Sequence, residues 1–191
     1  MYLLALIPHR DAFPVLRAYR RVLFAGDFEG TYAFPLAVPL AVLPRPFSRE
    51  TLKRLAGALR TESLAGGRDG KFRSGTAFIQ DLPELFGGIG AFLGIYVDIR
   101  LPPMTGLGEA KKGAEIQYLF PRPALCAALI PGAEYKGLQK PIPPVFSFRA
   151  AALANINFSF RPLSPAGAAG SAGGYASEWE TGPLVWLPNY K

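Results

Sequence analysis

Apolar residues in this chain occur in short runs, and several of these runs have the pattern of β-strands. Residues 3–7 are all apolar and end at Pro8, which predicts a short buried strand. In residues 91–101, apolar positions alternate with Tyr96, Asp98 and Arg100, so we expect a strand with one apolar and one polar face. Further strands are expected at residues 71–80, at 145–161 (one long strand or two short ones) and at 175–180 with 183–187.

Two runs, residues 34–43 and 124–130, carry no charged side chain. The first is apolar throughout, so we expect a strand that is covered on both faces. Pro39 lies within it. Because proline has no N–H to donate to a sheet ladder, this strand should lie at a sheet edge or contain a bulge.

Helices are predicted at two places. The first is expected to begin with Asp11 as its cap, to have Pro14 in its first turn and to stop near Gly26. The second is expected to begin at Ser48 and has an apolar stripe at helical spacing. Residues 104–120 show a weaker helical pattern. The stripe of the second helix is Leu52, Leu55, Ala56 and Leu59, and the basic residues expected on the polar sides of the two helices are Arg17, Arg20, Arg21, Arg49, Lys53, Arg54 and Arg60.

The composition limits both the fold and the chemistry. Half of the 191 residues are hydrophobic and 18% are charged, which suits one packed domain over residues 1–191. The 21 glycines and 19 prolines favour short strands joined by turns over a helical bundle. One cysteine and one histidine exclude an internal disulfide, a cysteine-rich zinc site and any mechanism that needs two imidazoles. We expect no metal and no cofactor.

The net charge of +7 arises mainly in the first part of the chain, since residues 1–75 hold 12 basic but only 6 acidic side chains. This excess could attract the phosphate backbone of a nucleic acid, but a soluble protein with an arginine-rich surface is the simpler explanation. Residues 1–8 are too short for a signal peptide, and no uncharged run reaches the roughly 20 residues of a membrane span. We therefore expect a cytoplasmic protein without a membrane partner.

The expected order of elements is strand, helix, uncharged strand, helix, two strands, weak helix, uncharged strand and terminal hairpin. This order resembles that of the two-histidine phosphoesterase superfamily, which contains 2′-5′ RNA ligase-like proteins and cyclic phosphodiesterases. The resemblance implies an α+β fold of two pseudo-symmetric, interleaved lobes around a central cleft, each lobe an antiparallel sheet with helices on its outer face. In that family, each lobe carries a His-x-Thr/Ser motif on an inward strand. One imidazole serves as base and the other as acid on a 2′,3′-cyclic phosphate, while the hydroxyls bind phosphate oxygens.

The two uncharged runs stand where the family motifs are expected. The resemblance implies that Ala37 and Ala124 replace the two histidines, and that Pro39 and Cys126 replace the two hydroxyl residues. Alanine can neither accept nor donate a proton, so the acid/base mechanism is lost. We therefore predict a non-catalytic 2′-5′ RNA ligase-like protein. Its apolar cleft floor favours closure of the cleft, or its reuse for a small ligand or a protein partner, over phosphate binding.

Two other classes of function remain open. One is a divergent phosphoesterase or RNA-processing enzyme that uses Arg73, Asp98 or Tyr175. Asp98 lies beside Tyr96 and Arg100 on the polar face of its predicted strand. A cross-strand ion pair would account for a carboxylate at this position equally well. Tyr175 and Trp179 could stack on a base or a sugar, although packing of the terminal strand on the core is the simpler account. The other class is nucleic-acid binding through the basic first part of the chain.

The remaining polar and reactive residues are expected to have structural roles. His9 follows a short strand at a helix start, so we expect a surface or capping role for it. Cys126 has apolar neighbours, which predicts a buried and inert thiol. The alternate residues Asn155, Asn157, Ser159 and Arg161 are expected to form a solvent-facing row on one strand.

Overall fold

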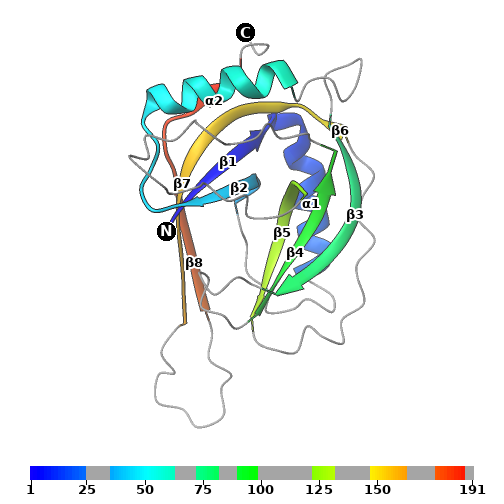
Figure 1. Cartoon of the computed structure of the whole chain (residues 1–191). Helices are drawn as coiled ribbons and strands as arrows, with labels where there is room; N and C mark the ends of the chain where they lie inside the picture. Colours follow the sequence, from blue (N-terminus) through cyan, green and yellow to red (C-terminus); the bar gives the residue numbers. More distant parts are fainter. Residues whose placement is uncertain are drawn as a thin grey trace.

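The computed structural model describes residues 1–24, 35–62, 72–81, 90–98, 122–131, 147–162 and 175–187. Within these ranges the chain has a mixed α+β fold built on two antiparallel sheets (Figure 1), which confirms the expected fold class at this level. The expected helix at 104–120, the end of the strand predicted at 91–101 and the stop at Gly26 lie outside the described residues.

Each sheet is a set of antiparallel strands from distant parts of the chain. The first has the order β2-β1-β7-β8, with β9 also paired to β7, and the second has the order β5-β4-β3-β6. The strands of the first sheet are β1 (Tyr2–Pro8), β2 (Val38–Leu43), β7 (Ala150–Pro162), β8 (Tyr175–Thr181) and β9 (Val185–Trp186). Those of the second are β3 (Phe72–Asp81), β4 (Gly90–Val97), β5 (Ala124–Pro131) and β6 (Ser147–Phe148).

The two uncharged runs contain β2 and β5, and each is the end strand of its sheet. The strand predicted over residues 34–43 is shorter in the structure, because β2 begins at Val38 and residues 35–37 lie outside it. These two end strands contact each other, so the sheets meet where the sequence is least polar. Pro39 lies on the edge strand β2 and pairs with Ala5 immediately after a register shift in the β1–β2 ladder. The expectation that this proline requires an edge or a bulge is confirmed, and the structure provides both.

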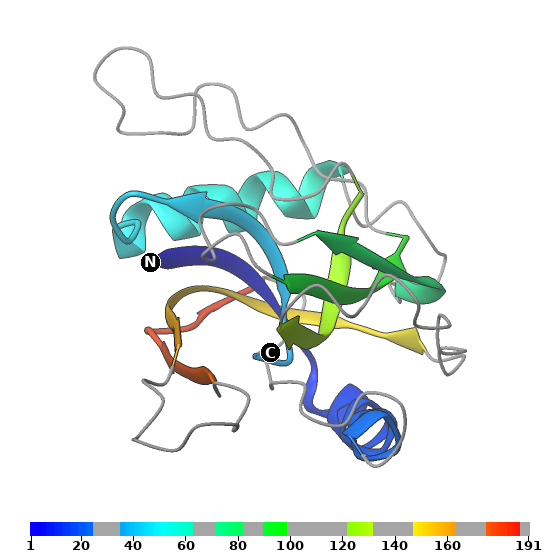
Figure 2. The same ribbon diagram turned by 90° about the horizontal axis from the view of Figure 1, so that it is seen from below.

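Two helices pack on these sheets. α1 (Phe13–Phe24) contacts β5, and α2 (Arg49–Glu62) contacts β7 and β9. Figure 2 shows the two helices well apart from each other, in agreement with their contacts to different sheets. The predicted apolar stripe of α2 is buried in the largest hydrophobic cluster, together with Leu16 and Tyr19 of α1 and residues of both sheets. Burial of this stripe accounts for the stability of a helix whose other side is charged.

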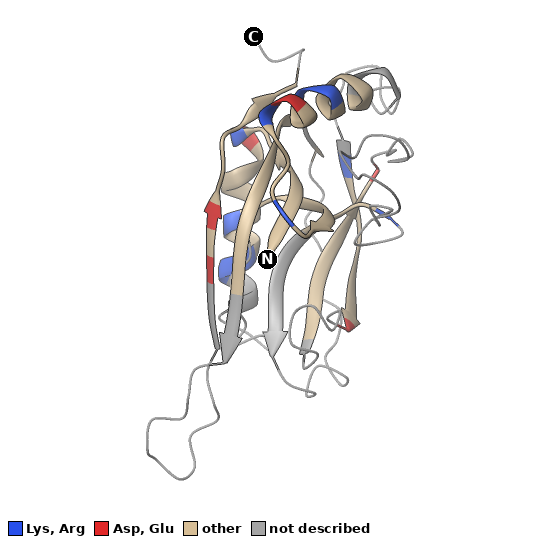
Figure 3. Ribbon diagram, turned by 60° about the vertical axis from the view of Figure 1, so that its left-hand side comes forward, with Lys and Arg blue, Asp and Glu red and all other residues tan. Residues whose placement is uncertain are grey.

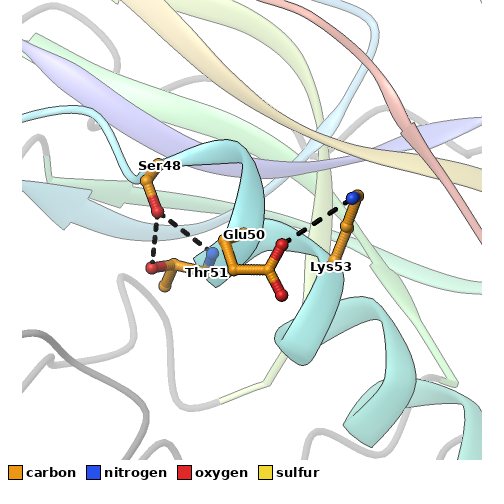
Figure 4. Close-up of polar contacts among 4 residues, drawn as sticks. All are labelled: Ser48, Glu50, Thr51 and Lys53. Atoms are coloured by element: carbon orange, nitrogen blue, oxygen red, sulfur yellow. Dashed lines mark hydrogen bonds and ion pairs between the residues drawn. The ribbon is translucent and has the colours of Figure 1, made fainter.

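The two helices begin differently. Ser48 caps α2 as predicted, since its Oγ accepts a hydrogen bond from the backbone N–H of Thr51 at 3.1 Å (Figure 4). The prediction that Asp11 caps the first helix is wrong. A 3₁₀ turn, η1 (Arg10–Ala12), precedes α1, and His9 is its N-cap because the imidazole Nδ1 accepts from the backbone N–H of Asp11. The capping role expected for His9 is thereby confirmed.

The sequence predicts one long strand or two short ones over residues 145–161, and the described part forms two strands in different sheets. β6 pairs with β3, whereas β7 pairs with β1. Arg149 lies between them, and its carbonyl accepts a hydrogen bond from the backbone N–H of His9 at 2.6 Å. The chain therefore passes from one sheet to the other at this residue.

Candidate functional site

A cluster of apolar side chains lies between the two sheets; we call it the between-sheet cluster. On β1 its members alternate with Leu4 and Leu6, which belong to the cluster that packs under the helices. Successive side chains of a strand point to opposite faces, so the between-sheet cluster lies on the faces turned away from the helices. Its buried members are Leu3, Ala5, Ile156 and Phe158 from the first sheet, Ala37 directly before β2, and Phe78, Phe92 and Ala124 from the second sheet.

The positions that the family resemblance assigns to the two histidines both lie in this cluster. Ala37 and Ala124 are each 0% exposed. Pro39 is buried and pairs with Ala5, itself a cluster member. Cys126 pairs with Gly94 in the β4–β5 ladder, and its side chain, with the thiol predicted to be inert, lies outside the described residues. Three of the four predicted positions therefore gather around one apolar interior.

The ring of Phe78 fills the space above Gly94. A Cβ atom at position 94 would lie 2.4 Å from Cζ of Phe78, so only glycine allows this ring to stay where it is. Phe78 also stacks on Tyr96, with ring centroids 4.2 Å apart, and its centroid is 6.2 Å from that of Phe92. Sequence reasoning missed both Phe78 and Phe92. The spacing of Phe92, Gly94 and Tyr96 at every second residue was the available indication that they share a face.

Arg122 lies at the rim of this cluster. Its guanidinium carbon is 4.6 Å from the centroid of the Tyr96 ring, a cation–π contact. Arg122 is exposed and Tyr96 is half-buried, so the stack runs from solvent down to Phe78. The interior of the between-sheet cluster is uncharged, and the Arg122 guanidinium lies at the boundary between this interior and the solvent.

The structure brings the alternative site residues Arg73 and Asp98 together but places Tyr175 in the other sheet. The Asp98 carboxylate accepts a hydrogen bond from the backbone N–H of Arg73, and the backbone N–H of Asp98 donates to the carbonyl of Arg73 at 3.3 Å. These bonds tie the ends of β3 and β4 together. Asp98 thus has a structural role, which is to bond the backbone of Arg73 and differs from the cross-strand ion pair that the sequence left open. Tyr175 begins β8 in the other sheet, and its side chain lies outside the described residues.

Seven of the 12 basic residues of the first part of the chain lie on the two helices. Arg17 and Arg21 are exposed on α1, as predicted. The prediction that Arg20 shares their solvated side is wrong, because Arg20 is buried. On α2 the described basic residues are exposed, and Lys53 forms an ion pair with Glu50 at 3.7 Å. Figure 3 shows this basic charge on both helices and the acidic residues of β8 on the first sheet.

The polar row expected on β7 is only partly solvent-facing. Asn157 and Ser159 are exposed, whereas Asn155 is buried. Its side chain accepts from the backbone N–H of Phe47 at 3.0 Å and donates to the carbonyl of Phe47 at 2.8 Å. Asn155 therefore fixes the segment that leads into α2, and this pairing explains why an amide is tolerated in the interior.

Within the described ranges, no three His, Cys, Asp or Glu side chains are grouped so that they could hold a metal ion. Neither α-helix in these ranges has the length and apolar character of a membrane span. Comparison with protein-family models gives no match, and neither does comparison with curated proteins or with solved structures.

Proposed function

We propose that this chain is a non-catalytic relative of the two-histidine phosphoesterases and acts by binding a partner. One observation carries the proposal: Ala37 directly precedes the end strand of one sheet and Ala124 begins the end strand of the other, yet both are fully buried in one apolar cluster. In the family these positions would hold the base and the acid of the reaction. Here they hold methyl groups.

The arrangement of the strands supports the kinship. In both sheets the uncharged strand is at the end, next to a strand that contributes to the between-sheet cluster, namely β1 in one sheet and β4 in the other. The contact between β2 and β5 joins the two sheets at equivalent places. This is the relation expected of two pseudo-symmetric lobes that face a common centre.

The chemistry of the between-sheet cluster supports the loss of catalysis. Cleavage of a phosphodiester by this route needs a group that takes a proton and a second that gives one. The described side chains of the cluster are aliphatic or phenyl groups, and transfer of a phosphate into such surroundings is costly without charged partners.

The test is an assay of the full chain with 2′,3′-cyclic nucleotides. We expect no turnover above the uncatalysed rate. In a parallel NMR titration, the methyl resonances of Ala37 and Ala124 should not shift when a cyclic nucleotide is added. Turnover that disappears in Arg73→Ala or Asp98→Ala would overturn the proposal, and so would a saturable shift of either methyl group.

A further inference from the structure

Arg122 is held in place by an aromatic ring but is not neutralised by an acid. Its guanidinium carbon lies 4.6 Å from the centroid of the Tyr96 ring, and the side chain is exposed. Among the described residues, no carboxylate forms an ion pair with it. A guanidinium carries five N–H donors in one rigid fork, and an aromatic ring supplies none of the oxygen acceptors that these donors prefer. Arg122 is therefore oriented to bind an anion from outside the chain.

The strand next to Tyr96 leaves the surroundings of this ring open. The β3–β4 register shifts between Ser74 and Ala77, so that residues 75 and 76 both stand opposite Tyr96, as in a β-bulge. A Cβ atom at position 75 would lie 3.4 Å from Cβ of Tyr96, so a side chain there would lie against this residue, and glycine supplies none. Residues 75 and 76 are both exposed. Bulges are common next to functional sites, where they redirect side chains.

A second arginine lies on the same face of the second sheet. Because side chains alternate along a strand, Arg73 shares the face of position 75 and therefore of Tyr96. Arg73 is exposed, and the nearby Asp98 carboxylate accepts from its backbone N–H rather than forming an ion pair with its guanidinium. Figure 1 shows β3, β4 and β5 side by side. We call the surface formed by Arg73, Thr76, Tyr96 and Arg122 the arginine surface.

The chemistry of the arginine surface favours a carboxylate on a partner protein. A guanidinium binds a carboxylate through two parallel N–H···O bonds, and the net charge of +7 attracts an acidic partner. A nucleic acid is a poorer match, because the described residues 72–81, 90–98 and 122–131 hold two arginines and two aspartates rather than a row of cations. A free small molecule is also a poorer match, because pockets enclose most of such a ligand and this surface is exposed.

We propose that the arginine surface binds an acidic segment of a partner protein. Arg122, held over Tyr96, binds one carboxylate of the segment through both of its oxygens, and Arg73 supplies a cation for a neighbouring acidic residue. The segment lies over Gly75, where no side chain stands in its way. This inference deepens the proposed function, on which it rests for the role of binding a partner, and it names the chemistry of that partner.

The test measures fluorescence anisotropy of a labelled peptide in which aspartate alternates with glycine. The matched peptide has asparagine in place of every aspartate, so that only the charge differs. We expect saturable binding of the aspartate peptide to the full chain and at least about tenfold weaker binding of the asparagine peptide. Arg122→Ala should weaken binding of the aspartate peptide about tenfold.

The matched control is Arg17→Ala. Arg17 is also an exposed arginine over an aromatic ring, at 5.9 Å from the centroid of Phe13, but it lies on α1. Its removal changes the net charge of the protein by the same amount and should leave peptide binding within about twofold. An equal loss in both variants would mean that overall charge, not the arginine surface, attracts the peptide, and would overturn the proposal.

Two further variants test how Arg122 acts. Arg122→Lys keeps the charge but loses the fork, and should weaken binding about three- to fivefold. Tyr96→Leu removes the ring that holds the guanidinium and should weaken binding about threefold, with circular dichroism used to check that the protein stays folded. Binding that is unchanged in Arg122→Ala overturns the proposal.

Three other outcomes also overturn it: equal binding of the two peptides, binding of neither, or displacement of the aspartate peptide by a single-stranded oligonucleotide at equal concentration. The last would assign the arginine surface to nucleic acid. None of these outcomes decides whether cyclic nucleotides are turned over, and turnover would leave the peptide results as they are, so the two proposals fail separately.

Discussion

The between-sheet cluster and the edge strand β8 belong to the same sheet system but end in opposite environments. Ala37, Ala124 and Phe78 are buried in a cluster to which both sheets contribute, whereas residues 178–181 are exposed at four consecutive positions. The two regions nevertheless have comparable sequence, with aromatic and small residues at alternate positions. Their difference shows that alternation assigns residues to the faces of a strand but does not say what covers each face.

The largest expected contrast comes from removing one aromatic ring from each region. Phe78→Ala should lower the free energy of unfolding by about 3 kcal/mol or more, because it leaves a cavity under Tyr96 and Phe92. Trp179→Ala should cost less than about 1 kcal/mol, because that ring is already partly in water. Urea unfolding of both variants measures the difference. Equal losses would mean that the between-sheet cluster is not the tighter region.

The second test sharpens the description of the cluster itself. Gly94→Ala should destabilise the fold by about 1–3 kcal/mol, because the new methyl group overlaps the Phe78 ring. In a Phe78→Ala background the same change should lower the free energy of unfolding by clearly less, because the Phe78 ring atoms closest to the new methyl group are absent. A double-mutant cycle gives this coupling, and purely additive effects would contradict the packing described.

The smallest expected effect concerns a polar atom in the interior, in contrast to the exposed carboxylates of β8. Burial raises the pKa of Tyr19 to about 12, and its hydroxyl has no hydrogen-bond partner among the described residues. The folded state therefore holds this proton more tightly than the unfolded chain, whose tyrosine pKa is 10.0. Stability is complete below pH 10 and is lost as the pH rises toward 12, by about 1 kcal/mol near pH 11.

Unfolding measured across this alkaline range should show that Tyr19→Phe removes most of the loss. At neutral pH the same variant should be as stable as the original chain or slightly more so, because the buried hydroxyl leaves with its desolvation cost. An unchanged pH dependence in Tyr19→Phe would assign the alkaline loss to another group.

Most of the strands, and both helices, could be predicted from local patterns. The stripe of α2 and its Ser48 cap depend on residues within a few positions of one another, which is why spacing alone identified them. The edge position of β2 followed from Pro39, because a missing N–H restricts where a strand can pair. The cap of the first helical segment was missed because a 3₁₀ turn at residues 10–12 moves the start toward His9.

The candidate site was only partly predictable. Ala37 and Ala124 were singled out by a resemblance in element order, and the structure places both in one cluster. Phe78 and Gly94 were not found, because their relation is a contact between paired strands. Arg73, Asp98 and Tyr175 had suitable side chains for chemistry, but residue type does not reveal that the Asp98 carboxylate is used by a backbone N–H.

The amino-acid sequence by itself determined the alternation of short strands and two helices, the absence of a pair of imidazoles, and the uncharged character of β2 and β5. These properties depend on residue identity and on contacts close along the chain. The tertiary structure alone decided that β2 and β5 contact each other, that Phe78 lies over Gly94, and that both tryptophans are partly exposed to solvent. Burial depends on which distant segment covers a face, and local spacing carries no information about that segment.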